Sequence, residues 1–291
     1  MICCRSAYCS PMGLGGQMNP RLDAEPSFID LFNKYFEVVP ADSPKKKLEC
    51  YRLRYQVYCK EGVIRGFYPE NYPNGLEYDQ YDERSVHSLL MHKPTKSVAG
   101  TVRVVLPDQN KPEAQFPLEK FGSHSFYADV IPLESLPRLR LGEVSRLILA
   151  SKFRGRQDEN QFPYGMAENS EYPFPPDRRR KSSSLKTGSD DQRRAQQRTF
   201  PHAILGLLVA VVQISVQYNL NYLYVGIEPV CARLLRTFGI HFTPISPIID
   251  YYGPCRGYLG SIPDISKNIY LTNPQVWNLL FKNSALYPRP T

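Results

Sequence analysis

A charged strand lies near the middle of the chain, where residues 140–150 read RLGEVSRLILA. The alternation of apolar and polar residues predicts a β-strand here. A charge inside an apolar strand is unfavourable unless an opposite charge pairs with it. Glu143 and Arg146 therefore need partners from other segments, and those partners indicate which parts of the chain meet.

A second charged strand comes earlier in the sequence. Residues 98–106 read VAGTVRVVL, so that Arg103 stands among valines. Residues 85–91 form another candidate strand, and the Pro94-Thr95-Lys96 segment between the two predicts a hairpin turn. Arg103 raises the same question of charge pairing as Glu143 and Arg146.

A helix is predicted ahead of this hairpin. Ser43 followed by Pro44 combines a helix N-cap with a proline at the first helical position. Apolar and aromatic residues then recur at helical spacing to about Cys59. Arg54 and Tyr58 lie one turn apart on this helix.

An acidic segment, EYDQYD at residues 77–82, stands between the helix and the hairpin. Three acids and three arginines can neutralise one another and hold a cleft that binds a polar or zwitterionic acceptor: Asp79, Asp82, Glu143, Arg54, Arg103 and Arg146. The alternative is that Arg103 and Glu143 face solvent and the aspartates serve turns.

The other predicted elements complete an α/β chain. Residues 28–36 predict a short helix, 36–39 a strand and 107–137 an irregular segment. Helices are predicted at 203–218 and at 229–238, the latter ended by Gly239, and strands at 222–227, 240–252 and 257–262. Hairpins come early and one strand–helix–strand–helix unit late. A Rossmann sheet, a P-loop, a zinc motif and a nucleophile elbow are all missing from the sequence.

Composition divides the chain into four parts. Residues 1–26 predict a disordered tail, and 155–198 a disordered basic insertion, because it holds four consecutive basic residues and almost no aliphatics. Between them, 27–154 and 199–291 predict the two halves of one domain. The net charge of +8 raises nucleic-acid binding as an alternative. The basic residues lack interleaved aromatics, so we predict no nucleic-acid partner.

Several classes of protein are disfavoured. The seven cysteines are odd in number and scattered, which argues against a disulfide framework. None of the five histidines has a second ligand at metal spacing, so no metal is predicted; His87, near Asp82, could touch the site. The apolar run 203–216 is too short to span a bilayer, and no signal peptide is visible. We predict a cytoplasmic protein and leave peripheral membrane contact open.

The charged residues together resemble a family pattern. Acyl-homoserine-lactone synthases and N-acyl amino acid synthases carry an arginine and an aromatic one turn apart on the first helix. An acidic E-x-D-x-x-D segment, a strand arginine and an E-x-S-R strand follow. The same order is found here in Arg54 and Tyr58, in residues 77–82, in Arg103 and in residues 143–146. The segments 238–242 (FGIHF) and 251–258 (YYGPCRGY) resemble the acyltransferases associated with PEP-CTERM/exosortase systems.

This resemblance implies a GNAT-like (acyl-CoA N-acyltransferase) fold, α/β in class, whose central mixed, mostly antiparallel sheet is flanked by helices. It also implies an N-acyltransferase that moves a fatty acyl group from a thioester to a small-molecule amine. The roles that follow are Glu143 as base and Asp82 as second choice, with Arg54, Arg103 and Arg146 orienting the acids and binding the carboxylate of the acceptor. Acceptor binding is assigned to Arg54, Tyr58, Phe67, Asp79 and Arg146.

The donor is inferred from a missing motif. Ordinary GNAT enzymes bind coenzyme A with an Arg/Gln-x-x-Gly-x-Gly/Ala loop, whereas residues 152–156 here read KFRGR. This favours acyl carrier protein over coenzyme A as the acyl donor, with Lys45, Lys46, Lys47 and Arg154 as docking charges and no tightly bound cofactor. The apolar helix from Ala203 and the strand from Tyr222 would border the acyl chain, although core packing is the commoner role for such residues.

Two alternatives remain. One is a lactone-type synthase that uses S-adenosylmethionine, against which stands the Gly66-Phe67-Tyr68 segment in place of a tryptophan. The other is a non-catalytic module that binds an acyl ligand.

Overall fold

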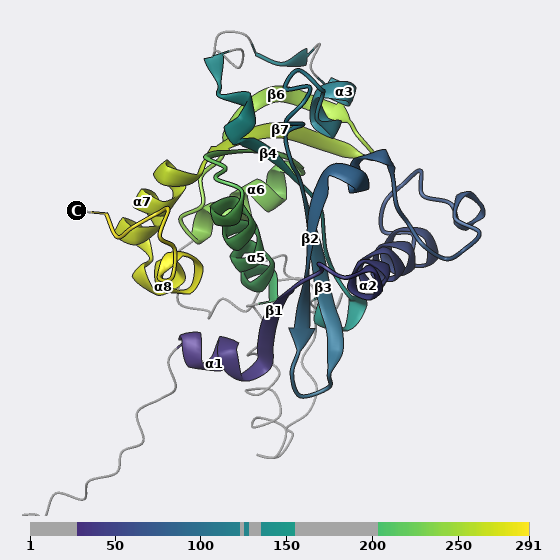
Figure 1. The fold of residues 1–291 in the computed structure, drawn as a ribbon, viewed down its shortest axis with the longest axis horizontal. Coiled ribbons are helices and arrows are strands. Elements are labelled where there is room, and N and C mark those ends of the chain that lie inside the picture. The colour runs from purple at the N-terminus through teal and green to yellow at the C-terminus, as the bar shows by residue number, and fades with distance from the viewer. Residues whose placement is uncertain (1–27, 123–124, 128–134, 155–202, 291) are drawn as a thin grey trace, which may run out of the picture.

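The computed structural model describes residues 28–122, 125–127, 135–154 and 203–290. A seven-stranded sheet in the order β1-β2-β3-β4-β5-β7-β6 forms its centre (Figure 1). Only β4 and β5 pair in parallel, and the other five pairs are antiparallel. The strands are β1 (Phe36–Pro40), β2 (Ser85–His92), β3 (Ser97–Val105), β4 (Leu141–Leu149), β5 (Tyr222–Ile227), β6 (Thr243–Asp250) and β7 (Pro254–Ser261).

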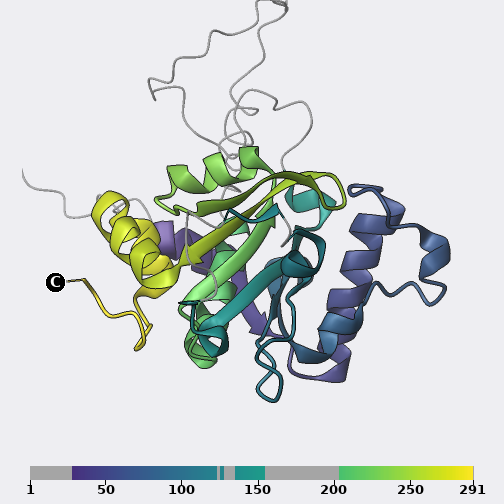
Figure 2. The same ribbon diagram turned by 90° about the horizontal axis from the view of Figure 1, so that it is seen from above.

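Helices cover both faces of the sheet (Figures 1 and 2). Helix α5 packs against β1 to β4 on one face, and α2 contacts β2 and β3 on the other. The helices are α1 (Phe28–Tyr35), α2 (Pro44–Tyr55), α3 (Pro117–Gly122), α5 (Ala203–Gln217), α6 (Pro229–Thr237), α7 (Ile262–Thr272) and α8 (Pro274–Phe281). This is the predicted mixed, mostly antiparallel sheet flanked by helices, and the chain on either side of residues 155–202 contributes to it.

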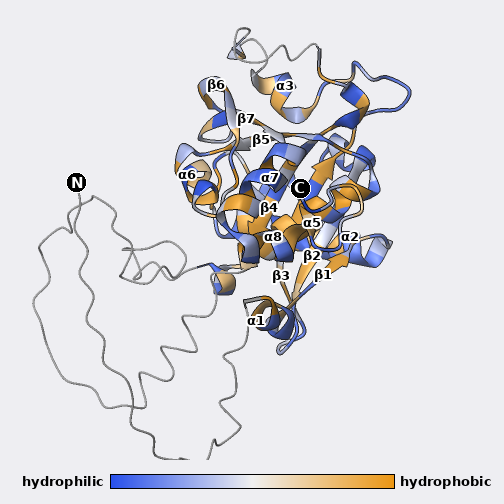
Figure 3. Cartoon of the chain, turned by 90° about the vertical axis from the view of Figure 1, so that its left-hand side faces the viewer, coloured by the Kyte–Doolittle hydropathy of each residue, from blue (hydrophilic) through white to orange (hydrophobic). Residues whose placement is uncertain are grey.

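The main core lies between the sheet and α5. Apolar colour gathers along α5 and the strands beside it in Figure 3, and this helix is buried along most of its length. A Cβ at Gly206 would stand 2.6 Å from Leu90 Cδ1. Glycine therefore lets α5 approach β2 closely. The acyl-binding role considered for this helix gives way to core packing, since its buried residues belong to the main apolar cluster.

Most predicted elements are confirmed, with small differences at their ends. Ser43 caps α2, its hydroxyl accepting the backbone N–H of Lys46 at 3.4 Å. After Tyr55 the helix widens into a π-helical turn, Gln56–Lys60, rather than running as an α-helix to Cys59. Gly239, with φ of 84°, ends α6 as predicted.

Three helices correct the prediction. The segment 107–137 is not wholly irregular, because α3 forms within it. The chain beyond residue 262 folds into α7 and α8, for which no element was predicted. The signal for both was present: Ser261 and Asn273 cap these helices and a proline follows each within the first turn, as at Ser43.

The predicted tail, residues 1–26, and the predicted insertion, residues 155–198, lie outside the described residues. Among the helices that are described, none is both long and apolar enough to cross a membrane.

Candidate active site

Six charged side chains from four segments meet on the α2 side of the sheet. We call this set the acid–arginine network: Arg54, Glu77, Asp79, Asp82, Arg103 and Arg146. Three guanidinium groups face three carboxylates, so the network as a whole is neutral. All six are fully or largely buried.

Arg54, on α2, binds two carboxylates of the acidic segment. Its Nε donates to Glu77, and its Nη1 and Nη2 donate to the two carboxylate oxygens of Asp82 at 2.7 and 3.0 Å. Asp82 in turn accepts the backbone N–H of Asp79 at 2.7 Å, and Asp79 accepts that of Tyr81 at 2.9 Å. This reciprocal capping builds a 3₁₀ turn, Gln80–Arg84, at the entrance to β2.

Arg103 and Arg146 reach the same acids from the sheet. Arg103 Nη1 lies 2.6 Å from Asp79 and 3.0 Å from Asp82, and its Nε donates to Ser145 Oγ at 3.0 Å. Arg146 Nη2 lies 3.0 Å from Glu77 and 2.9 Å from Asp79. Arg103 on β3 and Arg146 on β4 are therefore both paired with carboxylates, as a charge inside a strand requires.

A bulge in β4 directs Arg146. The pairing of β3 with β4 shifts between Thr101 and Arg103, and Arg146, on the opposite strand, adopts φ of 51°. A left-handed conformation is unfavourable for a residue with a Cβ, so surrounding contacts must hold it. The rings of Phe67 and Tyr58 supply them, 5.2 and 5.7 Å from the guanidinium carbon.

The two strands at the centre separate close to this bulge. The parallel pairing of β4 with β5 ends at Val144 and Val225. Strand β4 nevertheless continues to Leu149 and β5 to Ile227. Beyond this point the backbone groups of β4 and β5 do not pair with each other.

The network keeps its carboxylates ionised. Burial alone raises the pKa of Asp79, Asp82 and Glu77, but the adjacent arginines outweigh it. The pKa of Glu77 and Asp79 lies below the ordinary value, and that of Asp82 lies far below it. These acids are consequently anchors for the arginines and poor proton acceptors.

Glu143 has the opposite environment. It is 1% exposed, and its neighbours across the sheet are Val105 and Tyr224. Within the described part of the chain, its carboxylate accepts the backbone N–H of Leu118, on α3, at 2.8 Å. Burial raises the pKa of Glu143 to about 8, against the smaller lowering effect of that N–H. A carboxyl group of this kind can hold or release a proton near neutral pH.

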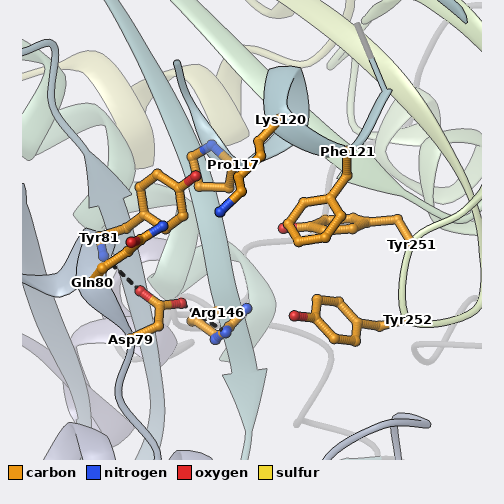
Figure 4. A pocket seen from close by; sticks show the side chains of 9 residues that line it. All are labelled: Asp79, Gln80, Tyr81, Pro117, Lys120, Phe121, Arg146, Tyr251 and Tyr252. Atoms are coloured by element: carbon orange, nitrogen blue, oxygen red, sulfur yellow. Dashed lines mark hydrogen bonds and ion pairs between the residues drawn. The ribbon is translucent and has the colours of Figure 1, made fainter. Parts of the chain in front are cut away.

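A cleft of about 270 Å³ opens beside the network. Its lining comes from the acidic segment, α3, β4 and the turn between β6 and β7, as Figure 4 shows. The lining residues are Asp79, Gln80, Tyr81, Pro117, Lys120, Phe121, Arg146, Tyr251 and Tyr252.

Two predicted site residues, Asp79 and Arg146, line this cleft directly. Arg54, Asp82 and Arg103 lie behind them within the network, and Glu143 lies beneath α3. Tyr58 and Phe67, predicted to line the acceptor pocket, are buried and support Arg146 from behind. The structure thus brings the predicted residues into one region but gives them different distances from the opening.

Aromatic residues from distant segments form the other wall. The ring of Phe121 lies 4.8 Å from that of Tyr251, tilted by 41°. Tyr251 lies 5.0 Å from Tyr252, and Tyr252 lies 4.8 Å from Phe67. Burial, followed by the charge of Glu143, raises the pKa of the Tyr251 hydroxyl. Tyr251 thereby connects the cleft electrostatically with the buried glutamate.

Sequence reasoning gave no site role to Lys120, Phe121, Tyr251 or Tyr252. The pair Tyr251-Tyr252 was singled out only as part of a family motif. A pair of aromatics before a glycine, in a turn between two strands, was the available signal. Nothing in the sequence indicated that this turn reaches α3.

His87 lies behind the network rather than in the cleft. Its Nε2 is 3.4 Å from Asp82 and its ring contacts Tyr51 edge-on. Burial lowers the pKa of His87 to about 4, with Asp82 acting in the opposite direction. The ring is therefore neutral near pH 7 and serves as packing around Asp82.

Among the described residues, no group of three or more His, Cys, Asp and Glu side chains is arranged to hold a metal ion.

Comparisons with known proteins agree with this architecture. A family model described as "Acetyltransferase (GNAT) domain" matches residues 53–161. The solved structure of TofI in a ternary complex with an inhibitor and MTA is similar, with 14% identity, a TM-score of 0.50 and coverage of 83% of this chain and 99% of that one. The fold is therefore GNAT-like, as predicted.

Two further solved structures resemble the chain more loosely. FeeM, an N-acyl amino acid synthase from uncultured soil microbes, is 12% identical with a TM-score of 0.49, covering 81% of this chain and 96% of its own. BjaI, a CoA-dependent acyl-homoserine lactone synthase with SAM and isopentyl-CoA, is 15% identical with a TM-score of 0.48, covering 83% and 89%. The comparison with curated proteins gave no match.

Proposed function

We propose that the protein is an N-acyltransferase that moves a fatty acyl group from an acyl carrier protein thioester to the amine of an amino acid-like acceptor. The observation that carries this proposal is the position of Glu143. It is a buried carboxyl group with a pKa near 8, tied to α3 beside a cleft that a neutral network of acids and arginines holds in shape. The match of residues 53–161 to the acetyltransferase (GNAT) model supports the reaction class.

The chemistry requires an amine without its proton. An amino group enters as an ammonium ion and loses one proton to Glu143. The nitrogen lone pair then attacks the thioester carbonyl, forming the C–N bond, and the C–S bond breaks to release a thiolate. Glu143 returns its proton to the thiolate and the amide nitrogen releases its second proton to solvent, so that the products are an amide, a free thiol and one proton in solution. Asp82 is the weaker candidate for the base, because two arginines bind it and lower its pKa.

Charge that develops on the carbonyl oxygen needs donors. Backbone N–H groups where β4 and β5 separate are suited to this role. Arg103 and Arg146 act as positioning residues in the proposal, since their hydrogen bonds are directed to the acids and to Ser145. Tyr58 and Phe67 keep Arg146 in its left-handed conformation.

We propose acyl carrier protein rather than coenzyme A as the donor because the usual coenzyme A loop motif is missing from the sequence. Carrier proteins are acidic, and Lys45, Lys46, Lys47 and Arg154 remain the proposed docking charges. Lys46 pairs with Asp42 at 3.0 Å and Arg154 pairs with Glu61, which weakens both as docking groups. Lys45 and Lys47 are the better candidates. The association with PEP-CTERM/exosortase systems rests on residues 238–258 and belongs to the same proposal.

The test is a parallel assay of the purified protein with matched acyl-carrier-protein and coenzyme A thioesters. Amino acids and simple amines serve as acceptors, and mass spectrometry detects the amide. We expect amide formation from the carrier-protein donor, a KM for that donor that rises with salt, and loss of product in Glu143→Gln. Preferential use of the coenzyme A thioester would overturn the donor assignment. Binding of the acyl donor without any amide product would overturn catalysis and leave an acyl-binding protein.

A further inference from the structure

The cleft contains one cation that the acid–arginine network does not neutralise. Each of the three arginines makes at least one contact of 3.0 Å or less with a carboxylate of the network. Lys120, by contrast, has no carboxylate within ion-pair distance among the described residues. Figure 4 shows its amino group extending into the space between Tyr81 and Tyr251. The lysine is therefore available to an anionic group of a bound molecule.

Helix α3 holds Lys120 in a fixed relation to the proposed base. The N–H of Leu118, two residues earlier, donates to Glu143. On its other side the helix packs tightly on β6, because a Cβ at Gly122 would stand 2.7 Å from Ile249 Cδ1. Glu119 pairs with Arg138 and accepts the backbone N–H of Phe116 at 2.9 Å, which stabilises the first turn. The position of Lys120 relative to Glu143 is thus set by four contacts.

The opposite charge in the cleft comes from Asp79. It is the one carboxylate among the nine lining residues, and its side chain is 29% exposed. The amino group of Lys120 on α3 and the carboxylate of Asp79, which also binds Arg103 and Arg146, line the same space of about 270 Å³. This arrangement matches a small molecule that carries both an ammonium and a carboxylate.

We infer that Lys120 binds the carboxylate of the acceptor and so selects amino acids over amines that lack this group. The inference rests on the proposed acyltransferase function and adds a residue to it. The ammonium would lie toward Asp79 and Glu143, and the acceptor side chain would pack on Phe121, Tyr251 and Tyr252. Arg54 and Arg146 make their hydrogen bonds to acids of the network, so the inference assigns the acceptor carboxylate to Lys120 in place of the arginines.

The test compares an acid with its own carboxamide. Phenylalanine and phenylalaninamide differ at the carboxylate and share the side chain and the amine. We expect the wild type to prefer phenylalanine by about tenfold or more in kcat/KM, the range of one charge-assisted contact. Lys120→Gln should lose that preference through a higher KM for phenylalanine, with phenylalaninamide unaffected. Lys120→Arg should restore part of it, and Lys111→Gln, an exposed lysine outside the cleft lining, should match the wild type.

The outcomes separate the two levels of the proposal. One outcome is that the protein acylates both amines while Lys120→Gln leaves the preference unchanged or lowers both rates equally. In that outcome acyl transfer is supported, but Lys120 does not bind the carboxylate of the acceptor. If no amine is acylated, the proposed function fails, and calorimetric binding of the same two compounds decides on Lys120. Tighter binding of the acid that disappears in Lys120→Gln supports the assignment; equal binding of acid and amide overturns it.

Discussion

Buried acids with opposite surroundings lie in two parts of the site, the acid–arginine network and the contact of β4 with α3. In the network Glu77, Asp79 and Asp82 are buried with arginines, and their pKa values are lowered. At β4, Glu143 is buried and, among the described residues, accepts the N–H of Leu118, and its pKa is raised to about 8. The residue types are the same, so the surroundings alone separate acids that fix geometry from an acid that can exchange a proton.

The largest expected effect comes from breaking the network. Arg54→Ala leaves Glu77 and Asp82 buried without their main partner, and we expect a loss of about 3–5 kcal/mol in the free energy of unfolding. Denaturant unfolding measures it. Arg52→Ala is the matched control, because this arginine lies on the same helix in an exposed pair with Glu49 and should change stability by less than about 0.5 kcal/mol. Equal stability of the two variants would contradict the structural role of the network.

The next effect concerns activity rather than stability. Glu143→Gln keeps the size of the side chain and an acceptor for the Leu118 N–H but removes the proton-accepting group. We expect the transfer rate to fall by about 10²–10⁴-fold with an unchanged or higher melting temperature. Asp82→Asn should instead lower the melting temperature. A Glu143→Gln variant with wild-type turnover would remove Glu143 from the mechanism.

The contributions of Glu143 and Asp82 to stability should also respond to pH in opposite directions. The pKa of Glu143 is higher in the folded than in the unfolded chain, so its contribution favours folding at low pH and is lost as pH rises from about 4.5 to about 8. The pKa of Asp82 is lowered in the folded chain. Its contribution to stability is therefore present above pH 3.8, the ordinary pKa of aspartate, and is lost as the pH falls below that value.

Unfolding curves at pH 5 and pH 9 test the contribution of Glu143 to stability. The difference in free energy of unfolding between Glu143→Gln and the wild type should be more favourable to the variant at pH 9 than at pH 5. We expect this change to be about 1 kcal/mol or more. The transfer rate of the wild type should rise with pH and level off near 8 as Glu143 ionises. A rate that is flat between pH 6 and pH 9 would indicate that another group accepts the proton.

The smallest expected effect concerns Ser145, which lies on β4 with Glu143 and contacts the acid–arginine network. Ser145 follows Glu143 on the same face of β4 and accepts Arg103 Nε at 3.0 Å. Ser145→Ala removes one hydrogen bond to a buried guanidinium, and we expect a loss of about 1–2 kcal/mol with a modest decrease in rate. Ser145→Thr retains the hydroxyl and serves as the control. A loss as large as that of Arg54→Ala would show that the network depends on β4 as much as on α2.

The elements that sequence reasoning found share a local cause. Alternation in residues 140–150, helical spacing after Ser43 and the glycine at 239 each depend on neighbours within a few positions. Charge inside strands also indicated that Arg103 and Arg146 required partners, whereas Glu143, which was placed in the same set, has no ion pair among the described residues. Helices α7 and α8 were within reach of the same reasoning, since Ser261 and Asn273 repeat the cap chemistry of Ser43.

The sequence by itself therefore determined the strands of the sheet, most of its helices and most of the charges that had to be paired, although Glu77 takes the place predicted for Glu143. Only the tertiary structure decided which acid keeps its proton, because that depends on α3 covering Glu143 from a segment of weak helical pattern. It also decided that Tyr251 and Tyr252 meet Phe121, since the turn between β6 and β7 is far from α3 in the chain. Burial and long-range contacts set pKa values and cleft walls, and no local pattern of residues encodes them.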